Sequence, residues 1–493
     1  MSSPTDRLRN YEFPPRRGPE WGSGGIFGLK YHNGVLFFDL AFEAQAHFQR
    51  TDGETVYPFD LVGGGPRSGG DTYNAVETLD DEIFFGGWVH APAVYEGRAG
   101  KGGRILFTNK FSHLHSYDIR EDKVRLLWSD TAAHQTEWAG EVSEIVYDPV
   151  GDRLIIGRAD GSRNLGIYSV DRRQGRAERI SELPGLKGAL YLDHACFDVR
   201  RNWQSGVDAI QTIDLVTGKH SATGVDYATI SVDGGGVKWP SPGCAVSAYS
   251  RFFLFVRGGL LVGDPLGDLE GMSFVRLFDF GTGYSPSRTM CKVVVGGVLV
   301  AFNAYSNAFI HPRNDFESDA KEYANFISGP SVLLYVTPPQ ARVVSALGAR
   351  ITGFEKIGEK LLVASSSAAN LGADDATPMD TGHRDLSVFG LGQTLLSSPS
   401  VAFSTTGKRV ANDHWGGVPL DGHRRSSLTV DGGGENRLTV FEYDLGLPVR
   451  RARSESFALA PGRQAVDLSS FHGVVSFKFE KADTSSTIRI DLA

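Results

Sequence analysis

Apolar and polar residues alternate in short runs along the whole chain, and turns rich in glycine and aspartate separate the runs. One unit is an extended run, a tight turn and a second apolar run, as in IFGLKYHNGVLFFDLAFE from Ile26. Period-two alternation is typical of strands, and Asn33-Gly34, Gly151-Asp152 and His472-Gly473 are typical hairpin turns. Each such unit therefore predicts a hairpin of two antiparallel strands.

A second kind of unit follows each of the first kind. It is an apolar strand ending in aspartate or a similar residue, a turn and another strand, as in SYDIREDKVRLLW from Ser116 and TIRIDLA from Thr487. The alternation of the two units gives four antiparallel strands per repeat, which is a propeller blade. We predict an all-β fold: one closed β-propeller domain over residues 1–493, with eight four-stranded blades and seven as the alternative.

The last copy reaches only a third strand before Ala493. The segment Leu8–Phe13 is predicted to add the fourth strand, so that the N-terminal strand closes the last blade and removes free sheet edges. Two polar stretches near 309–329 and 369–436 do not fit a blade and are predicted to be inserted loops. The second contains His414, Trp415 and His423, and we expect it to form a mobile lid.

Composition narrows the class of protein. Hydrophobic residues make up 41% and charged residues 22%, which is ordinary for a globular protein. The net charge of −8 argues against a nucleic-acid binder held by phosphate contacts. The three cysteines form no CxxC motif, so a reducing compartment is expected. The sequence has neither a signal peptide nor an apolar run of about 20 residues, so we expect a cytoplasmic protein without membrane contact.

In a propeller, the loops that lead into the first strand of each blade share one face with the loops that leave the second strand. Polar and aromatic residues gather at these positions. The candidate catalytic residues are His90, Asp71, Glu141 and Asp160. The candidate substrate-binding residues are Trp21, Arg67, Trp138, Arg163, Lys187, Trp239, Arg288 and Arg463.

These residue types suit a sugar or an anionic ligand, because tryptophan stacks on a sugar face and arginine binds carboxylate or phosphate in bidentate fashion. The leading hypothesis is a carbohydrate-active enzyme, a lyase or hydrolase, acting on an acidic or phosphorylated sugar. The alternative is a non-catalytic scaffold that binds a protein or a glycan. A third interpretation is that the charged residues only pair with one another.

Metal and cofactor chemistry have weak signals. His113 and His115 are two residues apart on a predicted strand, so they face the same side at a spacing that metal ligands can have. Chance gives this spacing often, and we predict structural histidines and no metal site. No GxSxG, HExxH or P-loop motif occurs, so no cofactor is specified. The expected partner is a small molecule or a glycan, and the pattern does not specify an oligomeric state.

Several longer strings carry a family resemblance. They are EWGSGGIFGLKYHNGVLFFDLAFEAQAHF, GPRSGGDTYNAV, FFGGWVHAPAVY and EWAGEVSEIVYDP with ADGSRNLGIYS. In the order of the motifs and in their residues, they resemble an uncharacterised, largely archaeal family that has only a domain-of-unknown-function label, number 2139. The resemblance covers most of the chain and is strongest from Glu20 to about Arg179. It implies an archaeal cytoplasmic source, and it assigns no activity and no catalytic residue.

Overall fold

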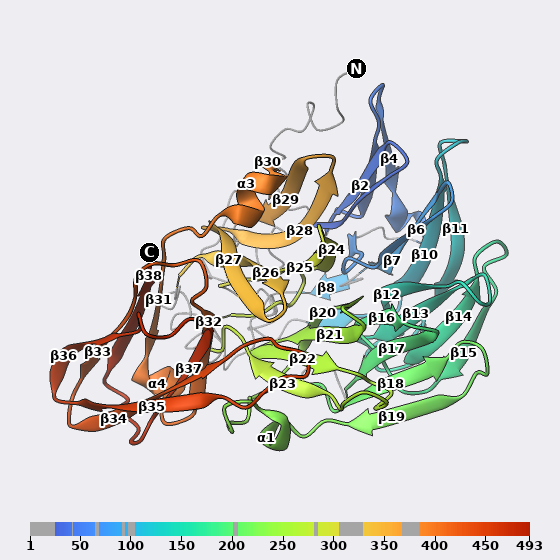
Figure 1. The fold of residues 1–493 in the computed structure, drawn as a ribbon. Coiled ribbons are helices and arrows are strands. Elements are labelled where there is room, and N and C mark those ends of the chain that lie inside the picture. The colour runs from blue at the N-terminus through green and yellow to red at the C-terminus, as the bar shows by residue number, and fades with distance from the viewer. Residues whose placement is uncertain are drawn as a thin grey trace. The chain divides into compact units, whose positions relative to one another are not determined.

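The structure is a computed structural model, and it describes residues 25–41, 43–64, 69–90, 94–96, 104–200, 206–280, 284–304, 329–366 and 384–493 (Figure 1). Nearly all regular elements are strands. The contacts group the chain into two compact units. Unit 1 contains the described parts of residues 1–223 and 351–391, and unit 2 contains those of 224–306, 321–350 and 392–493.

Unit 1 consists mainly of antiparallel sheets whose neighbouring strands follow one another in sequence. The strands of the first sheet are β1 (Ile26–His32), β2 (Val35–Leu40), β3 (Gln45–Gln49) and β4 (Glu54–Pro58). The second sheet is five-stranded and includes β6 (Val76–Leu79), β7 (Glu82–Val89), β10 (Phe111–Asp118) and β11 (Lys123–Asp130). The next two sheets are four-stranded, with β12 (Glu141–Asp148), β13 (Arg153–Ala159), β14 (Gly166–Asp171) and β15 (Ala177–Ser181), and then β16 (Gly188–Tyr191), β17 (His194–Val199), β18 (Ala209–Asp214) and β19 (His220–Gly224). The three-stranded sheet has β28 (Arg350–Ile357), β29 (Lys360–Ser366) and β30 (Arg384–Gly390). A short strand β5 (Gly70–Asp71) also pairs with β7, and β8 (Val94–Glu96) pairs with β9 (Arg104–Leu106). This meander is the topology of a propeller blade.

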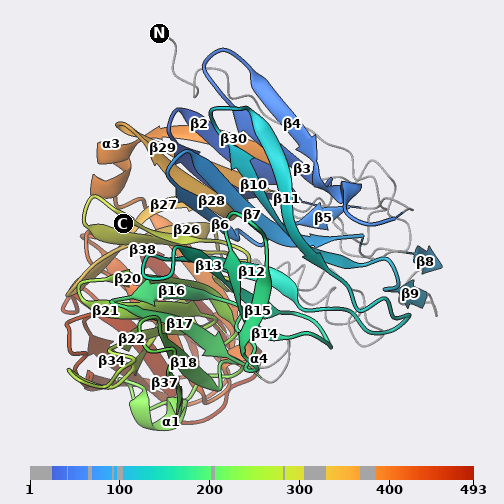
Figure 2. The same cartoon turned by 90° about the vertical axis from the view of Figure 1, so that its right-hand side faces the viewer.

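The predicted hairpin turns explain why these strands reverse where they do. Asn33 and Gly34 have φ values of 45° and 84°, and this pair of positive values suits the right-handed twist of the flanking strands. Asp80 and Asp152 have φ values of 52° and 48° at the equivalent turns of the next two sheets. Figure 2 shows β16, β17 and β18 side by side in sequence order.

Consecutive sheets of unit 1 bury their faces against each other. Phe37 of β2 lies 5.1 Å from Phe85 of β7 between ring centroids, and Phe48 of β3 stacks on Tyr117 of β10 at 3.8 Å. Further apolar clusters join the β6–β11 sheet to β12–β15, β12–β15 to β16–β19, and β28–β30 to β1–β4. This serial face-to-face packing is the way a repeat protein builds one core from neighbouring units.

Unit 2 combines two blade-like sheets with a different architecture. The meanders are β20 (Pro242–Ala248), β21 (Arg251–Val256), β22 (Gly259–Gly263) and β23 (Ser273–Arg276), then β24 (Cys291–Val294), β25 (Gly297–Phe302), β26 (Ser331–Thr337) and β27 (Gln340–Leu347). The remaining strands are β31 (Val401–Thr406), β32 (His414–Pro419), β33 (Ser426–Gly432), β34 (Asn436–Tyr443), β35 (Arg453–Leu459), β36 (Gly462–Asp467), β37 (Val474–Phe479) and β38 (Thr487–Leu492). The helices are α1 (Tyr227–Ile230), α3 (Leu391–Leu396), which begins at the last residue of unit 1, and α4 (Gly407–Val410).

The strands β31 to β38 form a sandwich rather than a blade. One sheet has the order β31-β38-β33-β36 and the other β32-β37-β34-β35 (Figure 1, orange to red). Leu428 and Ile490 of the first sheet belong to the same buried cluster as Val440 and Phe477 of the second. Apolar residues from the two facing sheets therefore make the core, as in β-sandwiches generally.

The sandwich corrects the last predicted blade. The strand at Thr487–Leu492 already pairs with β31 on one side and β33 on the other, so it has no free edge to which the predicted fourth strand could add. The predicted hairpin at His472-Gly473 is wrong, because β36 pairs with β33 and β37 pairs with β32 and β34. Alternating residues bury one face equally well in a blade and in a sandwich, so the pattern does not specify the partner strand. Leu8–Phe13 lies outside the described residues, and the closed ring of eight blades in one domain stays a prediction.

The predicted insertion at 369–436 is wrong from Arg384 onward, where the chain forms β30 to β33 and two short helices. Residues 309–328 and 369–383 lie outside the described part. Trp415 is not on a lid, because it is buried in the core and its ring lies 4.6 Å from that of Phe477. Across the described ranges, no helix is both long and apolar enough to cross a membrane.

Candidate functional site

Seven predicted site residues lie in the described part of unit 1 and three in unit 2. Those of unit 1 are Asp71, His90, Trp138, Glu141, Asp160, Arg163 and Lys187, and those of unit 2 are Trp239, Arg288 and Arg463. Trp21 and Arg67 lie outside the described residues. The two groups are treated separately below.

The loops around β12 and β13 bring four of the unit 1 residues to one place. Glu141 begins β12 and is the register partner of Ala159, the last residue of β13. The preceding loop and the following loop are then joined by backbone hydrogen bonds, from Gly140 N to Arg163 O at 2.7 Å and from Ser162 N to Trp138 O at 2.9 Å. Trp138, Glu141, Asp160 and Arg163 therefore occupy one end of this hairpin, as the repeat argument predicts.

Trp138 is the half-buried aromatic residue at this end. Its ring stacks on Phe107 with centroids 4.5 Å apart, and its Nε1 donates to the Asp160 carbonyl oxygen at 2.7 Å. The Asp160 carboxylate accepts a hydrogen bond from the Tyr73 hydroxyl at 2.6 Å. We call Tyr73, Phe107, Trp138, Asp160 and Arg163 the Trp138 corner.

Lys110 lies beneath this corner in a box of aromatic rings. Its Nζ is 5.1 Å from the Trp88 ring, 5.6 Å from Phe107 and 5.3 Å from Trp138, and it forms an ion pair with Glu141. Both Lys110 and Glu141 are buried. We call these five residues the Lys110 cage. Ammonium–ring attraction strengthens when the cation is desolvated, so the cage holds Trp138 in place while neutralising Glu141. Lys110 was missed because no motif marks it.

Lys187 and Asp71 also converge on Tyr73, but in structural roles. The Lys187 ammonium donates to the backbone oxygens of Tyr73 at 2.8 Å and Ser143 at 2.7 Å, and it lies 3.4 Å from the Glu144 carboxylate. Burial raises the pKa of Glu144, and Lys187 offsets part of that shift. The buried Asp71 carboxylate accepts from Tyr73 N at 2.8 Å. With three partners for its three protons, Lys187 holds the loop rather than a ligand.

His90 lies in the interior of unit 1. It is fully buried, has a φ of 63°, and its Nε2 lies 2.7 Å from the Val62 carbonyl oxygen. A carbonyl only accepts, so Nε2 carries the proton and donates. The predicted role of His90 as a base thus has no support from its surroundings.

A second buried carboxyl, Asp39, lies beside this region and was not predicted. Its Oδ1 accepts a hydrogen bond from the Thr72 hydroxyl, while its buried Oδ2 has no hydrogen-bond partner. Burial, followed by the nearby Asp71, raises the pKa of Asp39 well above its usual range. The sequence did carry a signal, because Asp39 is the one charged residue in the buried run VLFFDL.

His113 and His115 face the same side of β10, as predicted. Their Nδ1 atoms are 3.0 Å apart, both side chains are buried, and His115 stacks on Phe85 at 5.0 Å. Burial lowers the pKa of both, that of His115 to about 3. Where the structure describes the chain, it contains no group of three histidine, cysteine, aspartate or glutamate residues placed to hold a metal. The pair is part of the core between two sheets.

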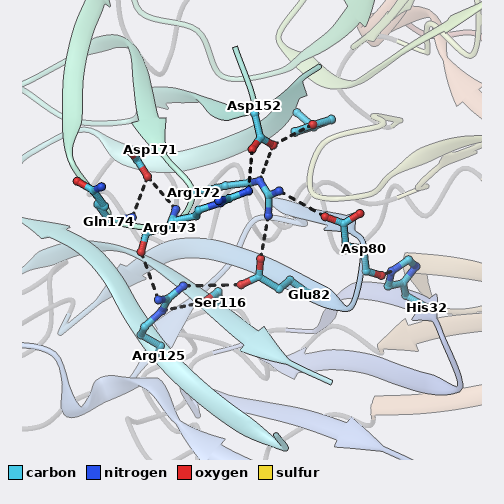
Figure 3. Close-up of polar contacts among 11 residues, drawn as sticks. His32, Asp80, Glu82, Ser116, Arg125, Asp152, Asp171, Arg172, Arg173 and Gln174 are labelled. Atoms are coloured by element: carbon cyan, nitrogen blue, oxygen red, sulfur yellow. Dashed lines mark hydrogen bonds and ion pairs between the residues drawn. The ribbon is translucent and has the colours of Figure 1, made fainter. Parts of the chain in front are cut away.

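The densest charged cluster of unit 1 lies at the other end of the same strands (Figure 3). Arg172 follows β14, and its guanidinium contacts Asp152 at 2.6 Å, Glu82 at 3.2 Å and Asp80 at 3.4 Å. Asp80 and Asp152 are the hairpin-turn residues of two neighbouring sheets. Arg172 therefore ties the two sheets together, whereas Asp160 occupies the opposite end of β13.

The three candidates of unit 2 belong to different kinds of sheet. Arg463 is exposed on β36 of the sandwich, where its register partner is Asp431. It was assigned to the ligand face only because the sandwich strands were counted as a blade. Trp239 and Arg288 do lie on loops that lead into the first strands of the two blade-like sheets.

The comparisons with known proteins give a family and a fold likeness. A sequence profile of the family described as an uncharacterised protein conserved in archaea (DUF2139) matches residues 36–374. The chain is similar to the streptogramin B lyase structure, with 10% identity, 78% of this chain and 97% of that chain covered, and a TM-score of 0.40. It is also similar to the β-propeller domain of the Trilobed protease from Pyrococcus furiosus, with 10% identity, 74% and 98% covered, and a TM-score of 0.40.

A third similar structure is an exo-β-1,3-galactanase from Phanerochaete chrysosporium, with 7% identity, 85% and 95% covered, and a TM-score of 0.29. No curated protein matches the sequence. The sheets in the described part of the chain are antiparallel and mostly four-stranded.

Proposed function

The chain belongs to the family of uncharacterised proteins conserved in archaea (DUF2139), and we propose that it binds an acidic or phosphorylated sugar at the Trp138 corner. The observation that carries the proposal is a half-buried tryptophan held rigidly beside a carboxylate, a hydroxyl and an arginine. A small-molecule site usually combines an aromatic surface with a small number of polar groups that point toward the ligand.

Each side chain of the corner has a part in this binding. The Trp138 ring stacks on the apolar face of a pyranose, and Asp160 and Tyr73 hydrogen-bond its hydroxyl groups. Arg163 is paired with Glu137 and is half exposed, so its guanidinium can exchange that partner for a sugar carboxylate or phosphate. The Lys110 cage adds a positive charge beneath the ring, balanced by Glu141.

Binding fits the corner better than catalysis does. Of the four candidate catalytic residues, Asp71 and His90 are buried and hydrogen-bonded, and Glu141 is buried in an ion pair. Asp160 alone is partly accessible. A glycosidase needs two carboxyl groups that both reach the scissile bond.

Titration calorimetry on the full chain tests the proposal, with a galacturonate oligosaccharide, glucose 6-phosphate and a neutral oligosaccharide as probes. We expect Trp138→Ala to weaken binding of an anionic probe at least about tenfold, because hot-spot aromatics dominate small interfaces. Trp128→Ala is the matched control, since Trp128 is a partly buried tryptophan of the same unit that packs on Arg158. Equal affinity of Trp138→Ala and wild type would refute the site.

A lyase remains the second candidate, and the short Tyr73–Asp160 hydrogen bond favours it. In uronate elimination, a base removes the proton next to the carboxylate, and the glycosidic oxygen leaves. Tyr73 would be that base after its phenol proton passes to Asp160, and the protonated Asp160 would then give this proton to the leaving glycosidic oxygen. Formation of unsaturated uronate by wild type, and its loss in Tyr73→Phe with binding retained, would support this reaction; binding without product favours the scaffold.

A further inference from the structure

Two loops of unit 2 each present a large side chain from a left-handed backbone position. Trp239 precedes β20 and has a φ of 48°, and Arg288 precedes β24 and has a φ of 53°. Positive φ is uncommon for residues other than glycine, and such strain collects at functional sites. Both residues were predicted as ligand-binding residues, and the Trp138 corner does not include them.

Trp239 is exposed although tryptophan usually buries its ring. Its side chain keeps 68% of its accessible surface, the largest value for an aromatic residue in the described part of the chain. Pro240 follows and favours an extended conformation at residue 239, which increases the strain. The Trp239 carbonyl oxygen accepts from Ser241 N at 2.7 Å and from Arg257 Nε at 2.9 Å. These two hydrogen bonds fix the backbone of Trp239, whose ring is exposed to solvent.

The loop of Arg288 is equally well anchored. Ser285 exchanges two backbone hydrogen bonds with Asn303, at 3.0 and 2.9 Å, and its hydroxyl accepts from Ser287 N at 3.0 Å. The loop also lies against the start of β20, because a Cβ on Gly243 would come within 2.3 Å of the Pro286 carbonyl oxygen. The loop of Arg288 therefore contacts β20, the strand that follows the loop of Trp239, within the same unit.

We propose that Trp239 and Arg288 form a second sugar site, in which the indole stacks on a pyranose ring and the guanidinium binds its carboxylate or phosphate group. The site shares its ligand class with the Trp138 corner but none of its residues, so it does not depend on that proposal. Aromatic side chains lose little conformational entropy on binding. The strained backbone at Trp239 therefore has a function, because it keeps such a side chain at the surface where a ligand can reach it.

The surroundings of Trp239 favour a sugar over a protein partner. Its neighbours are charged or polar: Lys238 is paired with Asp413 at 2.5 Å, and Ser241 is hydrogen-bonded in the loop. Pro240 is buried, so it adds no apolar surface. A stable protein interface needs on the order of 1,000 Å² or more of complementary surface. One ring in a polar setting matches the area of a sugar face instead.

Glycine substitutions test this site without adding backbone strain, because glycine adopts positive φ freely. We expect Trp239→Gly to keep or raise the melting temperature and to lower the affinity of unit 2 for a galacturonate oligosaccharide at least tenfold. Arg288→Gly should weaken anionic probes and leave a neutral oligosaccharide unchanged. The matched control is Tyr249→Gly, an exposed aromatic residue with a φ of 53° in the turn after β20.

Calorimetric stoichiometry separates the two sites. If both exist, wild type binds two sugars per chain, and Trp239→Gly and Trp138→Ala each bind one. Loss of one sugar in Trp239→Gly alone supports the unit 2 site and refutes the Trp138 corner. Unchanged stoichiometry and affinity in Trp239→Gly refute the unit 2 site. Glucose 6-phosphate in place of galacturonate distinguishes a phosphate ligand from a carboxylate ligand.

Discussion

Two buried cations of this protein solve the same electrostatic problem differently. Arg276 in unit 2 is fully buried and contacts Asp233 at 2.7 Å, Asp279, and the carbonyl oxygens of Gly235 and Gly236 at 3.1 and 2.8 Å. Lys110 in unit 1 has one ionic partner and three aromatic rings. Arg276 has four directional acceptors and one ring, that of Phe274 at 5.8 Å, whereas Lys110 has one directional acceptor and three rings.

The difference separates a structural cluster from a ligand site. Asp233 also accepts from Ser476 of the sandwich strand β37 at 2.8 Å, and the Tyr443 hydroxyl donates to the Arg276 carbonyl oxygen at 2.8 Å. Arg276 thereby joins the β20–β23 sheet to the sandwich, with no side open. The Lys110 cage has one half-exposed wall, Trp138 with Phe107. A buried charge network that is complete stabilises the fold, whereas one with an exposed aromatic wall leaves a surface for a ligand.

The largest expected effect on stability comes from removing Arg276 from its cluster with Asp233 and Asp279, which we call the closed cluster. Arg276→Met should lower the free energy of unfolding by about 3–5 kcal/mol, because it leaves Asp233 and Asp279 buried without their cation. Urea denaturation followed by circular dichroism measures this change. Arg489→Ala, which removes an exposed pair with Asp491, should change stability by less than about 0.5 kcal/mol. Similar losses for the two variants would contradict the comparison.

We call the Lys110 cage, together with Arg163 and Glu137 at its exposed edge, the open cluster. Removing Lys110 should lower stability less than removing Arg276 does, and a second substitution at Glu141 should restore most of that stability. Lys110→Met leaves Glu141 buried without its cation and should destabilise by about 3 kcal/mol. Adding Glu141→Gln removes the stranded charge and should recover most of the loss. A double-mutant cycle by urea denaturation gives the coupling, with the exposed Lys219→Met as the control. Additive effects would mean that Lys110 and Glu141 do not interact.

The two clusters also show what a sequence pattern can predict of the fold. Turn residues with positive φ, such as Asn33 and Asp152, specify a hairpin locally, so the described blade-like sheets were predicted well. Strand partners far apart in the chain are not local. VFEYDLGLPVRRARS from Val440 forms the antiparallel pair β34 and β35 that a blade unit would have, but the other neighbour of β34 is β37 of the sandwich. The pairings that make the sandwich, such as Val401 of β31 with Leu492 of β38 and His414 of β32 with Lys478 of β37, join strands that are not neighbours in sequence.

The candidate site was predicted as far as the fold was: the sequence predicted which residues share an end of a hairpin. Repeat register placed Trp138, Glu141, Asp160 and Arg163 at one hairpin end, because equivalent positions of a meander share an edge. It could not say which of them are buried. Lys110 decides that for Glu141, and it comes from the loop before β10, outside the two loop positions considered. Likewise His90 sits at the predicted strand end, but its left-handed backbone turns its ring toward Val62.

Lowering the pH should destabilise unit 2 through Asp233 and stabilise unit 1 through Asp198. Burial raises the pKa of Asp233, but His414 and Arg276 outweigh it and hold that pKa below its usual range. Its stabilising contribution is present above about pH 4 and is lost as the pH falls further. In unit 1, burial raises the pKa of Asp198 to about 6. The contribution of Asp198 is present below about pH 4 and is lost as the pH rises through 6.

Asp198→Asn measures the unit 1 part of this difference. The amide oxygen can still accept from the backbone nitrogens of Leu186 and Lys187, which now lie 2.9 and 2.6 Å from the carboxylate. We expect the variant to be more stable than wild type at pH 7 by on the order of 2 kcal/mol, and to lose the fall in stability between pH 4 and 6. Urea midpoints across pH 4–7 provide the measurement, and parallel curves for variant and wild type would be the contrary result.

The smallest effect on stability should belong to the exposed edge of the open cluster. Arg163 pairs with Glu137, and their side chains are 51% and 34% exposed. Exposed pairs contribute little, so Arg163→Ala should change the free energy of unfolding by less than about 0.5 kcal/mol. Its affinity for a galacturonate oligosaccharide should nevertheless fall about tenfold, because a bidentate contact to carboxylate is lost.

Arg173→Ala is the control for this variant, since Arg173 is an exposed arginine of the Arg172 cluster at the opposite end of the same hairpin. It should match Arg163→Ala in stability and wild type in affinity. A neutral oligosaccharide should bind wild type and Arg163→Ala equally, because only the anionic group needs the guanidinium. If Arg163→Ala lost stability by several kcal/mol and kept its affinity, the open cluster would be structural like the closed one, and the distinction drawn between the two cations would fail.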